Sequence, residues 1–262
     1  MIRALYTAAS GMSAQQANLD TVANNLANSG TAGFRRRRLQ FEDMVYQNLV
    51  TPGSAQSTQT TSAGLQIGLG TKPIATEVIM TQGDFNQTGN QFDLAIQGQG
   101  FFQVTRPDGS TAYTRAGSFH LNGQGQMVTP SGDAVTPAIT IPANATSISI
   151  SQYGVVTATV PGSNTGSQLG TIQLATFPNA GGLNSLGGNL FQPTSASGNA
   201  ITDSPGGSSG IGTLQQGYLE NSNVDVVEEF VQMVIAQRAY ESNSKVVRVA
   251  DDMYSQINNM VR

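Results

Sequence analysis

Residues that could carry chemistry are scarce, because the 262-residue chain has one His, no Cys and no Trp. The most specific pattern is G-x-S-x-G at Gly206, Ser208 and Gly210, which in one class of hydrolases places a nucleophilic Ser on a strained turn between a strand and a helix. Here the pattern lies in a run of Pro, Gly and Ser, and the only His, His120, precedes the Ser instead of following it. We therefore predict no catalytic residue, and a serine hydrolase that uses Ser208 and His120 is a remote alternative.

Metal and cofactor sites are not indicated either. His120 lies on a predicted strand, where alternation turns it toward solvent if Phe119 and Leu121 face the core. Gly98 and Gly100, like Gly68 and Gly70, lack the third glycine and the following helix of a dinucleotide loop. The acidic residues of the middle of the chain match no metal-ligand spacing: Asp84, Asp93, Asp108 and Asp133. We predict no metal ion and no cofactor.

Composition narrows the possible partners. The net charge is −4 and no apolar run has the length of a membrane span, so we expect neither nucleic-acid binding nor membrane insertion. The first 28 residues lack the features of a secretory signal, so export would need another route. Only 11% of residues are charged, against about 25% in ordinary soluble domains. Residues 134–202 include no Asp, Glu, Lys or Arg. A surface formed by these residues can pack against neighbours without burying charged side chains.

Two long amphipathic helices are predicted at the chain ends. The first covers residues 2–28 and stops near Gly30, and the second begins near Ser222, where Ser222 and Asp225 resemble a capping box. Apolar residues recur at seven-residue or three-to-four-residue steps, which is typical of a coiled coil. A pair of core helices in one globular domain is the alternative. The residues assigned to helix assembly are Ile2, Leu5, Met12, Leu19, Val22, Leu26, Ile235, Ala239, Val246, Val249, Met253, Ile257 and Met260.

Short strands with turns between them predict a small antiparallel sandwich or barrel over residues 94–177. Gly-, Ser- and Gln-rich stretches on either side read as connectors. The predicted fold is therefore α+β with three units: a helical coiled-coil unit (1–30 with 222–262), irregular connecting arms (31–93 with 178–221) and a central all-β domain (94–177). The four arginines at positions 35–38 are expected to form ion pairs between subunits or a solvated helix end.

Several runs resemble bacterial flagellar axial proteins, the family of rod and hook subunits. They are Ser10-Gly11-Met12, residues 23–28, Gly33-Phe34, residues 222–225 and residues 237–241, with residues 62–70, 97–104 and 112–115 in the middle. The signature positions are Gly11, Asp20, Asn24, Asn25, Asn28, Phe34, Asn223, Asp225, Gln237, Arg238 and Tyr240.

The resemblance implies a non-enzymatic subunit of the flagellar basal body that polymerises into a hollow, torque-carrying tube. Residues 51–83 favour the distal part of the rod, and a proximal rod subunit is the nearest alternative. The implied partners are further copies of the chain, proximal rod subunits, hook or hook-junction subunits, the surrounding rings and the type III export apparatus. The implied location is the periplasm-spanning basal body, reached without a cleaved signal. From another class, a secreted adhesin-like β-protein stays open, although it would leave the patterned chain ends without a purpose.

Overall fold

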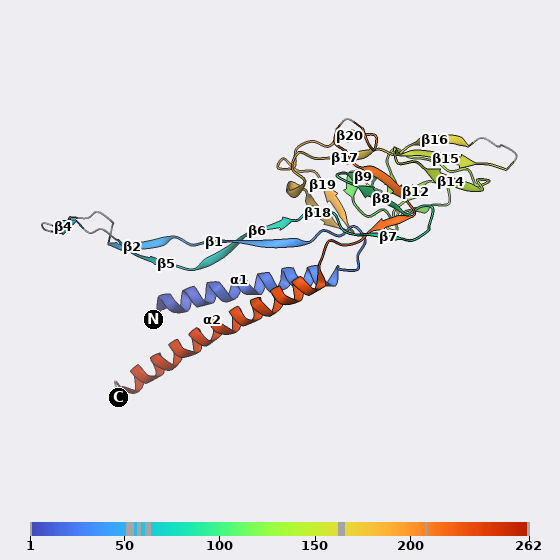
Figure 1. Cartoon of the computed structure of the whole chain (residues 1–262). Helices are drawn as coiled ribbons and strands as arrows, with labels where there is room; N and C mark the ends of the chain where they lie inside the picture. The colour runs from blue at the N-terminus through green and yellow to red at the C-terminus, as the bar shows by residue number, and fades with distance from the viewer. Residues whose placement is uncertain are drawn as a thin grey trace. The chain divides into compact units, whose positions relative to one another are not determined.

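The computed structural model describes residues 2–50, 55–56, 59–60, 64–161, 166–207 and 209–260. One helix lies at each end of the chain and the strands lie between them, which confirms the predicted α+β class (Figure 1). The chain divides into two compact units. The helical unit comprises residues 1–27, 37–78 and 225–262, and the β unit comprises residues 28–36 and 79–224.

Helices α1 (Ile2–Ala27) and α2 (Val226–Met260) lie side by side in the helical unit (Figure 1). With 26 and 35 residues, they are about 39 and 52 Å long at 1.5 Å per residue. The end of α1 meets the start of α2, where Asn25 contacts Glu229, and Gly11 lies against Asn243 further along. The helices are therefore antiparallel neighbours, which confirms the predicted pairing.

The contact face of α2 is built from small and polar residues. Glu229, Ala236 and Ala250 are buried and Asn243 is half-buried, and the four follow one another at seven-residue steps. That spacing keeps one face of α2 toward its partner, as in a coiled coil. Opposite Asn243, a Cβ atom at Gly11 would lie 2.8 Å from the Asn243 side chain, so Gly11 gives the two helices room to approach.

The start of α2 differs from the prediction, because Asp225 caps the helix and Ser222 does not. Asp225 Oδ1 accepts hydrogen bonds from the backbone N–H groups of Val227 (2.9 Å) and Glu228 (3.2 Å). The hydroxyl of Ser222 instead accepts from Val224 in the preceding loop. An acidic cap matches the positive end of the helix dipole, and with Asp225 as the cap the helix begins three residues later than a cap at Ser222 would place it.

The rest of the helical unit is a two-stranded ribbon, more regular than the extended connector that the sequence suggests. β1 (Arg37–Asp43) pairs with β6 (Thr71–Val78), β2 (Tyr46–Val50) with β5 (Leu65–Gly68), and β3 (Ala55–Gln56) with β4 (Gln59–Thr60). All three pairs are antiparallel. A ribbon of two strands is marginally stable alone, so its packing along α1 in this unit supports it.

An antiparallel sheet of nine strands forms the centre of the β unit. It runs in the order β11-β12-β13-β9-β10-β19-β18, with β17 joined to β9 and β20 joined to β17. The strands are β9 (Phe101–Thr105), β10 (Thr111–Thr114), β11 (His120–Leu121), β12 (Met127–Val128), β13 (Ala134–Val135), β17 (Leu174–Thr176), β18 (Asn184–Gly187), β19 (Leu190–Gln192) and β20 (Ile201–Asp203).

Smaller sheets and one short helix complete the β unit. They are the three-stranded sheet of β14 (Ser147–Ile150), β15 (Val155–Thr159) and β16 (Ser167–Thr171), the pairs β8 (Leu94–Gln97) with β21 (Thr213–Gln216) and β7 (Phe85–Gln87) with β22 (Tyr218–Glu220), and the 3-10 helix η1 (Ala180–Gly182).

The nine-stranded sheet has a core on each face, because successive side chains of a strand point in opposite directions. Phe102 of β9 belongs to the larger cluster, together with Leu94, Phe119 and Leu174. Its neighbour Phe101 belongs to a second cluster on the opposite face. This cluster consists of Phe101, Tyr113, Ala175, Phe177, Leu183 and Phe191.

Three local predictions for this unit need correction. The stretch 181–212, read as a connector, contributes β18, β19 and β20 to the main sheet, because apolar Leu183 and Phe191 pack into the second core cluster despite the surrounding Gly and Ser. Residues 139–141 carry the alternating pattern Ile-Thr-Ile, which predicts a strand within the 94–177 domain, but they form only a single bridge at Thr140. His120 is exposed as expected, but Leu121 is also exposed, since it directly precedes a turn.

We predict that Asp225→Ala lowers the free energy of unfolding by about 1 kcal/mol, because two N–H groups at the start of α2 lose their acceptor. Asp225→Asn keeps an acceptor oxygen and is the matched control. Chemical denaturation followed by circular dichroism measures both variants. Equal stability of the Ala and Asn variants would contradict the role of Asp225 as the cap.

Candidate assembly surfaces

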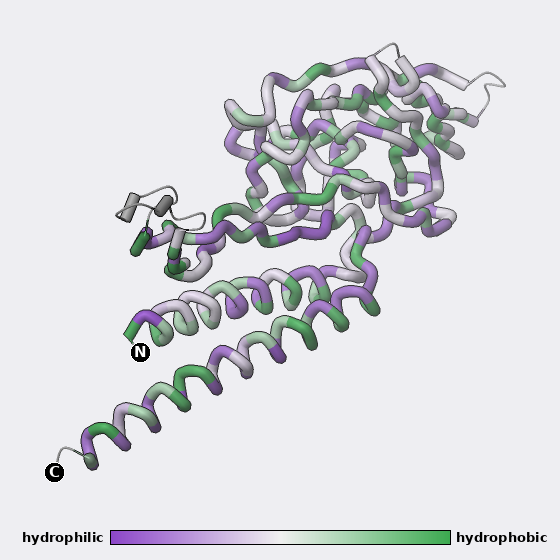
Figure 2. Tube along the Cα trace, turned by 60° about the vertical axis from the view of Figure 1, so that its left-hand side comes forward, coloured by the Kyte–Doolittle hydropathy of each residue, from purple (hydrophilic) through white to green (hydrophobic). Residues whose placement is uncertain are grey.

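One face of α2 carries an apolar stripe that its own chain leaves exposed, and Figure 2 shows the hydrophobic segments of this helix in green. Every member is at least 46% exposed. The stripe consists of Val227, Phe230, Val231, Val234, Ile235, Val246, Val249, Met253, Ile257 and Met260. Isolated exposed apolar residues are ordinary on a protein surface, but apolar residues gathered on one helix face, here over residues 227–235 and again over 246–260, mark an interaction site.

The helix register explains why the stripe continues to the end of α2. The contacts of Asn25 with Glu229 and of Gly11 with Asn243 set Ile2, the first residue of α1, opposite Asp252. The last two turns of α2 therefore extend beyond the start of α1. Met253, Ile257 and Met260 lie in this overhang, where α1 offers no residue to cover them.

An apolar hollow of about 440 Å³ lies elsewhere on the helical unit, between the first turns of α1 and the ribbon. Its lining residues are Arg3, Tyr6, Ala9, Ser10, Met44 and Leu69. The adjoining ribbon also exposes large apolar side chains, among them Val45 (79%) and Tyr46 (50%). The helical unit thus carries two separate apolar surfaces, the stripe on α2 and the hollow beside α1.

The residues predicted to mediate helix assembly fall into three groups in the single chain. Val22 is buried against the chain's own helices, whereas the others are half-buried or exposed. The half-buried residues are Leu5, Met12, Leu19, Leu26 and Ala239, and the exposed ones are Ile2, Ile235, Val246, Val249, Met253, Ile257 and Met260. Which of these residues contact other copies stays a prediction.

Asn25 joins three elements of the helical unit. The side-chain oxygen accepts from the backbone N–H of Arg37 (2.9 Å), and the side-chain amide donates to the Arg37 carbonyl (2.8 Å) and to Glu229 (3.2 Å). Asn25 and Glu229 are only 1% and 3% exposed. Asn25 thereby ties the end of α1 to β1 and to the first turn of α2, and this explains a poor helix former at that position.

Asn223 acts in the same way within the β unit. Its side-chain oxygen accepts from the backbone N–H of Arg36 (2.7 Å), and its amide donates to the carbonyls of Ile79 (2.9 Å) and Thr81 (3.0 Å). Two signature asparagines therefore hold the backbone of two consecutive residues, Arg36 and Arg37. An Asn side chain suits this task because it offers one acceptor and two donors in a plane.

A buried ion triad lies close by in the β unit. Glu220 accepts from Arg35 (2.7 Å) and Arg115 (2.6 Å), and its Oε1 also accepts from the backbone N–H of Gly83 (3.0 Å). The three charged side chains are at most 5% exposed. Burial lowers the pKa of Arg115, and the neighbouring Glu220 carboxylate acts in the opposite direction.

Residue 33 requires glycine beside this triad. Gly33 has a φ of 71°, and a Cβ atom there would lie 2.5 Å from the backbone nitrogen of Ala116. Its N–H donates to the backbone carbonyl of Glu220 (2.8 Å). Glycine is the residue that adopts this conformation at no steric cost, and it lets the chain enter the triad beside Arg35.

The arginine run at 35–38 is thus different from the prediction. Arg35 is buried and pairs within the chain, and Arg37 already belongs to β1, so the run does not form a helix end. Arg38 pairs with Glu77 across the ribbon, and hydrogen bonds from Arg38 and Gln40 lower the pKa of Glu77. Sequence patterns did not predict the ion pairs of Arg35 and Arg115 with Glu220. Charged residues are so rare in this chain that each one in the β-rich region is a candidate for a specific pairing.

The remaining signature residues lie at varied depths. Asp20 accepts a hydrogen bond from Gln16. Asp20, Asn24, Gln237, Arg238 and Tyr240 are exposed, and Asn28 and Phe34 are half-buried. We expect the exposed signature residues on the helices to contact other copies.

Of the chemical alternatives, Ser208 lies outside the described residues, and His120 is exposed on β11. In the part of the chain that the structure describes, no cluster of His, Asp and Glu could hold a metal ion. None of the described helices combines the length and apolarity that crossing a bilayer requires.

Exposed apolar surfaces like those on α2 and beside α1 are typical of a subunit that assembles with other chains. Comparison with known families agrees. Three family descriptions match the chain: "Flagella basal body rod protein" over residues 5–35, "Flagellar hook protein FlgE/F/G D1 domain" over residues 95–158, and "Flagellar basal body rod FlgEFG protein C-terminal" over residues 215–260.

Similar proteins align over nearly the full length of the chain. The chain is 47% identical over 258 residues to the flagellar basal-body rod protein FlgG of Buchnera aphidicola subsp. Baizongia pistaciae, covering 98% of this chain and 99% of that protein. It is 46% identical to the FlgG of Borreliella burgdorferi and 39% identical to that of Bacillus subtilis, with 100% of each chain covered in both cases. The chain belongs to the family of flagellar basal-body rod proteins, which are structural proteins. Its location is accordingly the flagellar basal body, in the rod that spans the periplasm.

We predict that Asn25→Ala lowers the free energy of unfolding by about 1–3 kcal/mol, because the N–H and C=O of Arg37 lose buried partners. Gln16→Ala removes only an exposed hydrogen bond from the same helix and is the control. Denaturant unfolding of the two variants provides the measurement. If they lose stability equally, Asn25 is not the clamp.

We also predict that Glu220→Gln destabilises the chain by about 3–5 kcal/mol, because two buried arginines lose their only shared counter-charge. Glu77→Gln breaks an exposed pair with Arg38 and should change stability little. Thermal unfolding in parallel tests both. A Glu220→Gln variant as stable as wild type would show that the triad does not hold the β unit together.

Proposed function

We propose that this chain is a subunit of the distal rod, where many copies stack into a hollow shaft that carries torque from the motor to the hook. The observation that carries the proposal is the apolar stripe of α2, which one chain cannot cover. Burying apolar surface stabilises by about 25 cal/mol per Å², so a stripe of ten large side chains is a strong drive for association.

The two apolar surfaces of the helical unit favour an open polymer over a closed dimer. The stripe and the hollow are different surfaces of one chain, so insertion of one into the other is a head-to-tail contact. Repeated head-to-tail contacts form rings or helical filaments. We propose that stripe residues of one copy fill the hollow beside Tyr6 and Met44 of the next copy.

Assignment to the distal rod, in place of the proximal rod, rests on the sequence of residues 51–83 and on the ribbon strands that the structure describes. In the ribbon, β2 pairs with β5 beyond β1 and β6, and Val45, Tyr46, Leu49 and Leu65 are exposed. An exposed apolar two-stranded ribbon gains stability from covering surfaces. We propose that this arm braces adjacent copies and stiffens the shaft.

We further propose a division of labour between the predicted units. Residues 1–30 and 222–262 line the inner tube, and residues 94–177 face the surrounding rings. The absence of charge from residues 134–202 would limit sticking of a rotating surface to those rings. Proximal rod subunits, hook or hook-junction subunits and the export apparatus are the other proposed partners.

A secreted adhesin-like β-protein is the alternative from another class. It would account for the charge-poor sheet, but it gives no role to the stripe on α2. Concentration-dependent filament formation separates the two functions, because an adhesin would remain monomeric.

We predict that Val249→Glu abolishes filament formation and leaves the monomer folded, because Val249 is 50% exposed and belongs to the second half of the stripe. Val249→Ile keeps the apolar surface and should assemble normally. Sedimentation and electron microscopy of the concentrated protein measure assembly, and circular dichroism checks the fold. Normal filaments from Val249→Glu would exclude the stripe as the assembly surface.

Position along the rod needs a separate experiment. We expect copies carrying a small density tag at the tip of the ribbon to appear in the hook-proximal part of the rod by electron cryotomography of cells. Tagged copies confined to the membrane-proximal part would identify a proximal rod subunit and contradict the distal assignment.

A further inference from the structure

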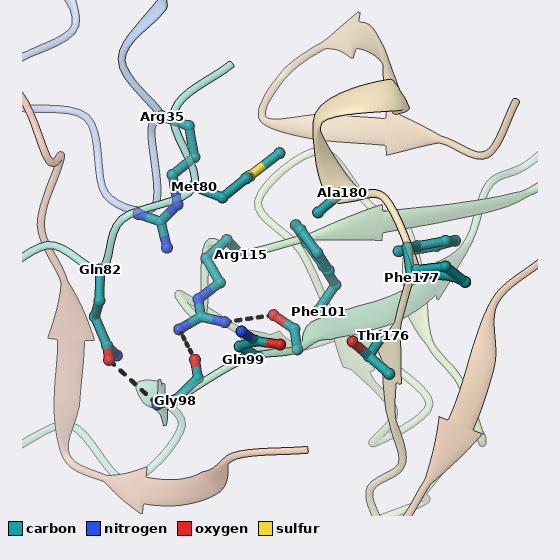
Figure 3. Close-up of a pocket in the computed structure, with 12 residues that line it drawn as sticks. Arg35, Met80, Gln82, Gly98, Gln99, Phe101, Arg115, Thr176, Phe177 and Ala180 are labelled. Atoms are coloured by element: carbon teal, nitrogen blue, oxygen red, sulfur yellow. Dashed lines mark hydrogen bonds between the residues drawn. The ribbon is translucent and has the colours of Figure 1, made fainter. Parts of the chain in front are cut away.

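The β unit contains a pocket of about 370 Å³ that is lined by Arg35 and Arg115, the two arginines of the buried ion triad (Figure 3). Arg35 and Arg115 supply its charged wall, and Phe101, Phe177 and Met80 supply an apolar wall. Its volume falls in the range of sites for small ligands, about 300–1,000 Å³. Phe101 and Phe177 meet edge-to-face at 5.8 Å between ring centroids, so the apolar wall is fixed by packing.

One donor in this pocket has no acceptor. Nη2 of Arg35 donates to Glu220 (2.7 Å), but among the described residues none accepts from Nη1, which is fully buried. Arg115 differs, because its three nitrogens donate to Glu220 and to the backbone carbonyls of Ile96, Gly98 and Gly100. A buried guanidinium donor without an acceptor is unfavourable, so this one favours a ligand that supplies an acceptor.

The charges point in the same direction. Arg35 and Arg115 carry two positive charges and share the single negative charge of Glu220. No acidic residue belongs to the described lining of the pocket. The site therefore keeps one positive charge in excess at low exposure, where an anion is attracted far more strongly than at the surface.

We infer that this pocket binds a carboxylate carried on an apolar stem, with the carboxylate against Arg35 and the stem against Phe101, Phe177 and Met80. A guanidinium offers parallel N–H donors that match the two oxygens of a carboxylate. The apolar wall excludes a small, fully hydrated anion as the best ligand, because it would leave that wall wet. The same chemistry has two sources: a free small carboxylic acid, or an acidic side chain of a second copy of this chain.

Titration of the full-length monomer with phenylacetate, followed by NMR, tests the inference, and phenylacetamide is the matched neutral probe. The acid should bind at least about tenfold more tightly than the amide, as expected from one hydrogen bond to a charged group. Resonances of Gly98 and Phe177 should shift on binding. Equal affinities for acid and amide, or no binding of the acid, would overturn the inference.

Two variants locate the binding in this pocket. Arg35→Lys keeps the charge but loses the planar pair of donors, and should weaken acid binding about tenfold. If that variant does not fold, Ala180→Leu serves instead, since it fills the pocket without touching the triad and should weaken binding similarly. Ala138→Leu, at an exposed position outside the pocket, is the size control. Acid binding unchanged by Ala180→Leu would refute the site.

The same titration on assembled filaments distinguishes the two sources. Filaments that no longer bind phenylacetate, although the monomer does, indicate that an acidic side chain of a neighbouring copy fills the pocket. Filaments that bind it as the monomer does indicate a free carboxylic acid. Because affinity is measured on the monomer, failure of this inference leaves the proposed rod function untouched, and failure of assembly leaves the binding result intact.

Discussion

The antiparallel pairing of α1 and α2 is the constraint on which the rest of the helical unit depends. Its register follows from two contacts, Asn25 with Glu229 and Gly11 with Asn243. The contact face of α2 uses Ala236, Ala250 and polar residues, so most large apolar side chains of this helix remain on other faces. Because the helices pair through small residues, the large apolar residues of α2 stay exposed. They are therefore available to contact neighbouring copies.

Hydrogen bonds from polar side chains hold the backbone at the points where the chain passes from one unit to the other. Asn25 holds the backbone of Arg37 in the helical unit, and Asn223 holds that of Arg36 in the β unit. Within the β unit, Glu220 gathers Arg35 and Arg115. Removing one member of such a buried network leaves the other members without hydrogen-bond partners. The resulting loss of folding free energy is larger than the contribution of the hydrogen bond itself. These junctions hold the segments between the elements of the chain in place, as a structural rod subunit requires.

Sequence patterns predicted the parts of the fold that follow from periodicity. Apolar repeats predicted both helices, their pairing, and strands such as residues 101–105. The structure confirms these elements and the helix pairing. The patterns failed where long-range contacts decide. Nothing local distinguishes the strands at residues 184–192 and 201–203 from a Gly-rich loop, and the cap at Asp225 could not be separated from Ser222. The triad of Arg35, Arg115 and Glu220 joins residues up to 185 positions apart, a distance that no local pattern bridges. The seven-residue repeat of Leu5, Met12, Leu19 and Leu26 was found, but those residues are only half-buried in one chain, so which surface covers them remains a prediction.

Hydrogen–deuterium exchange of α2, compared between monomer and filament, tests the central claim most directly. The overhang of α2 beyond Asp252 has no α1 residue opposite and exposes Met253, Ile257 and Met260. We predict rapid amide exchange over residues 253–260 in the monomer and strong protection of the same amides in the filament. Equal protection in the two states would mean that neighbouring copies do not cover this helix, and would contradict the account.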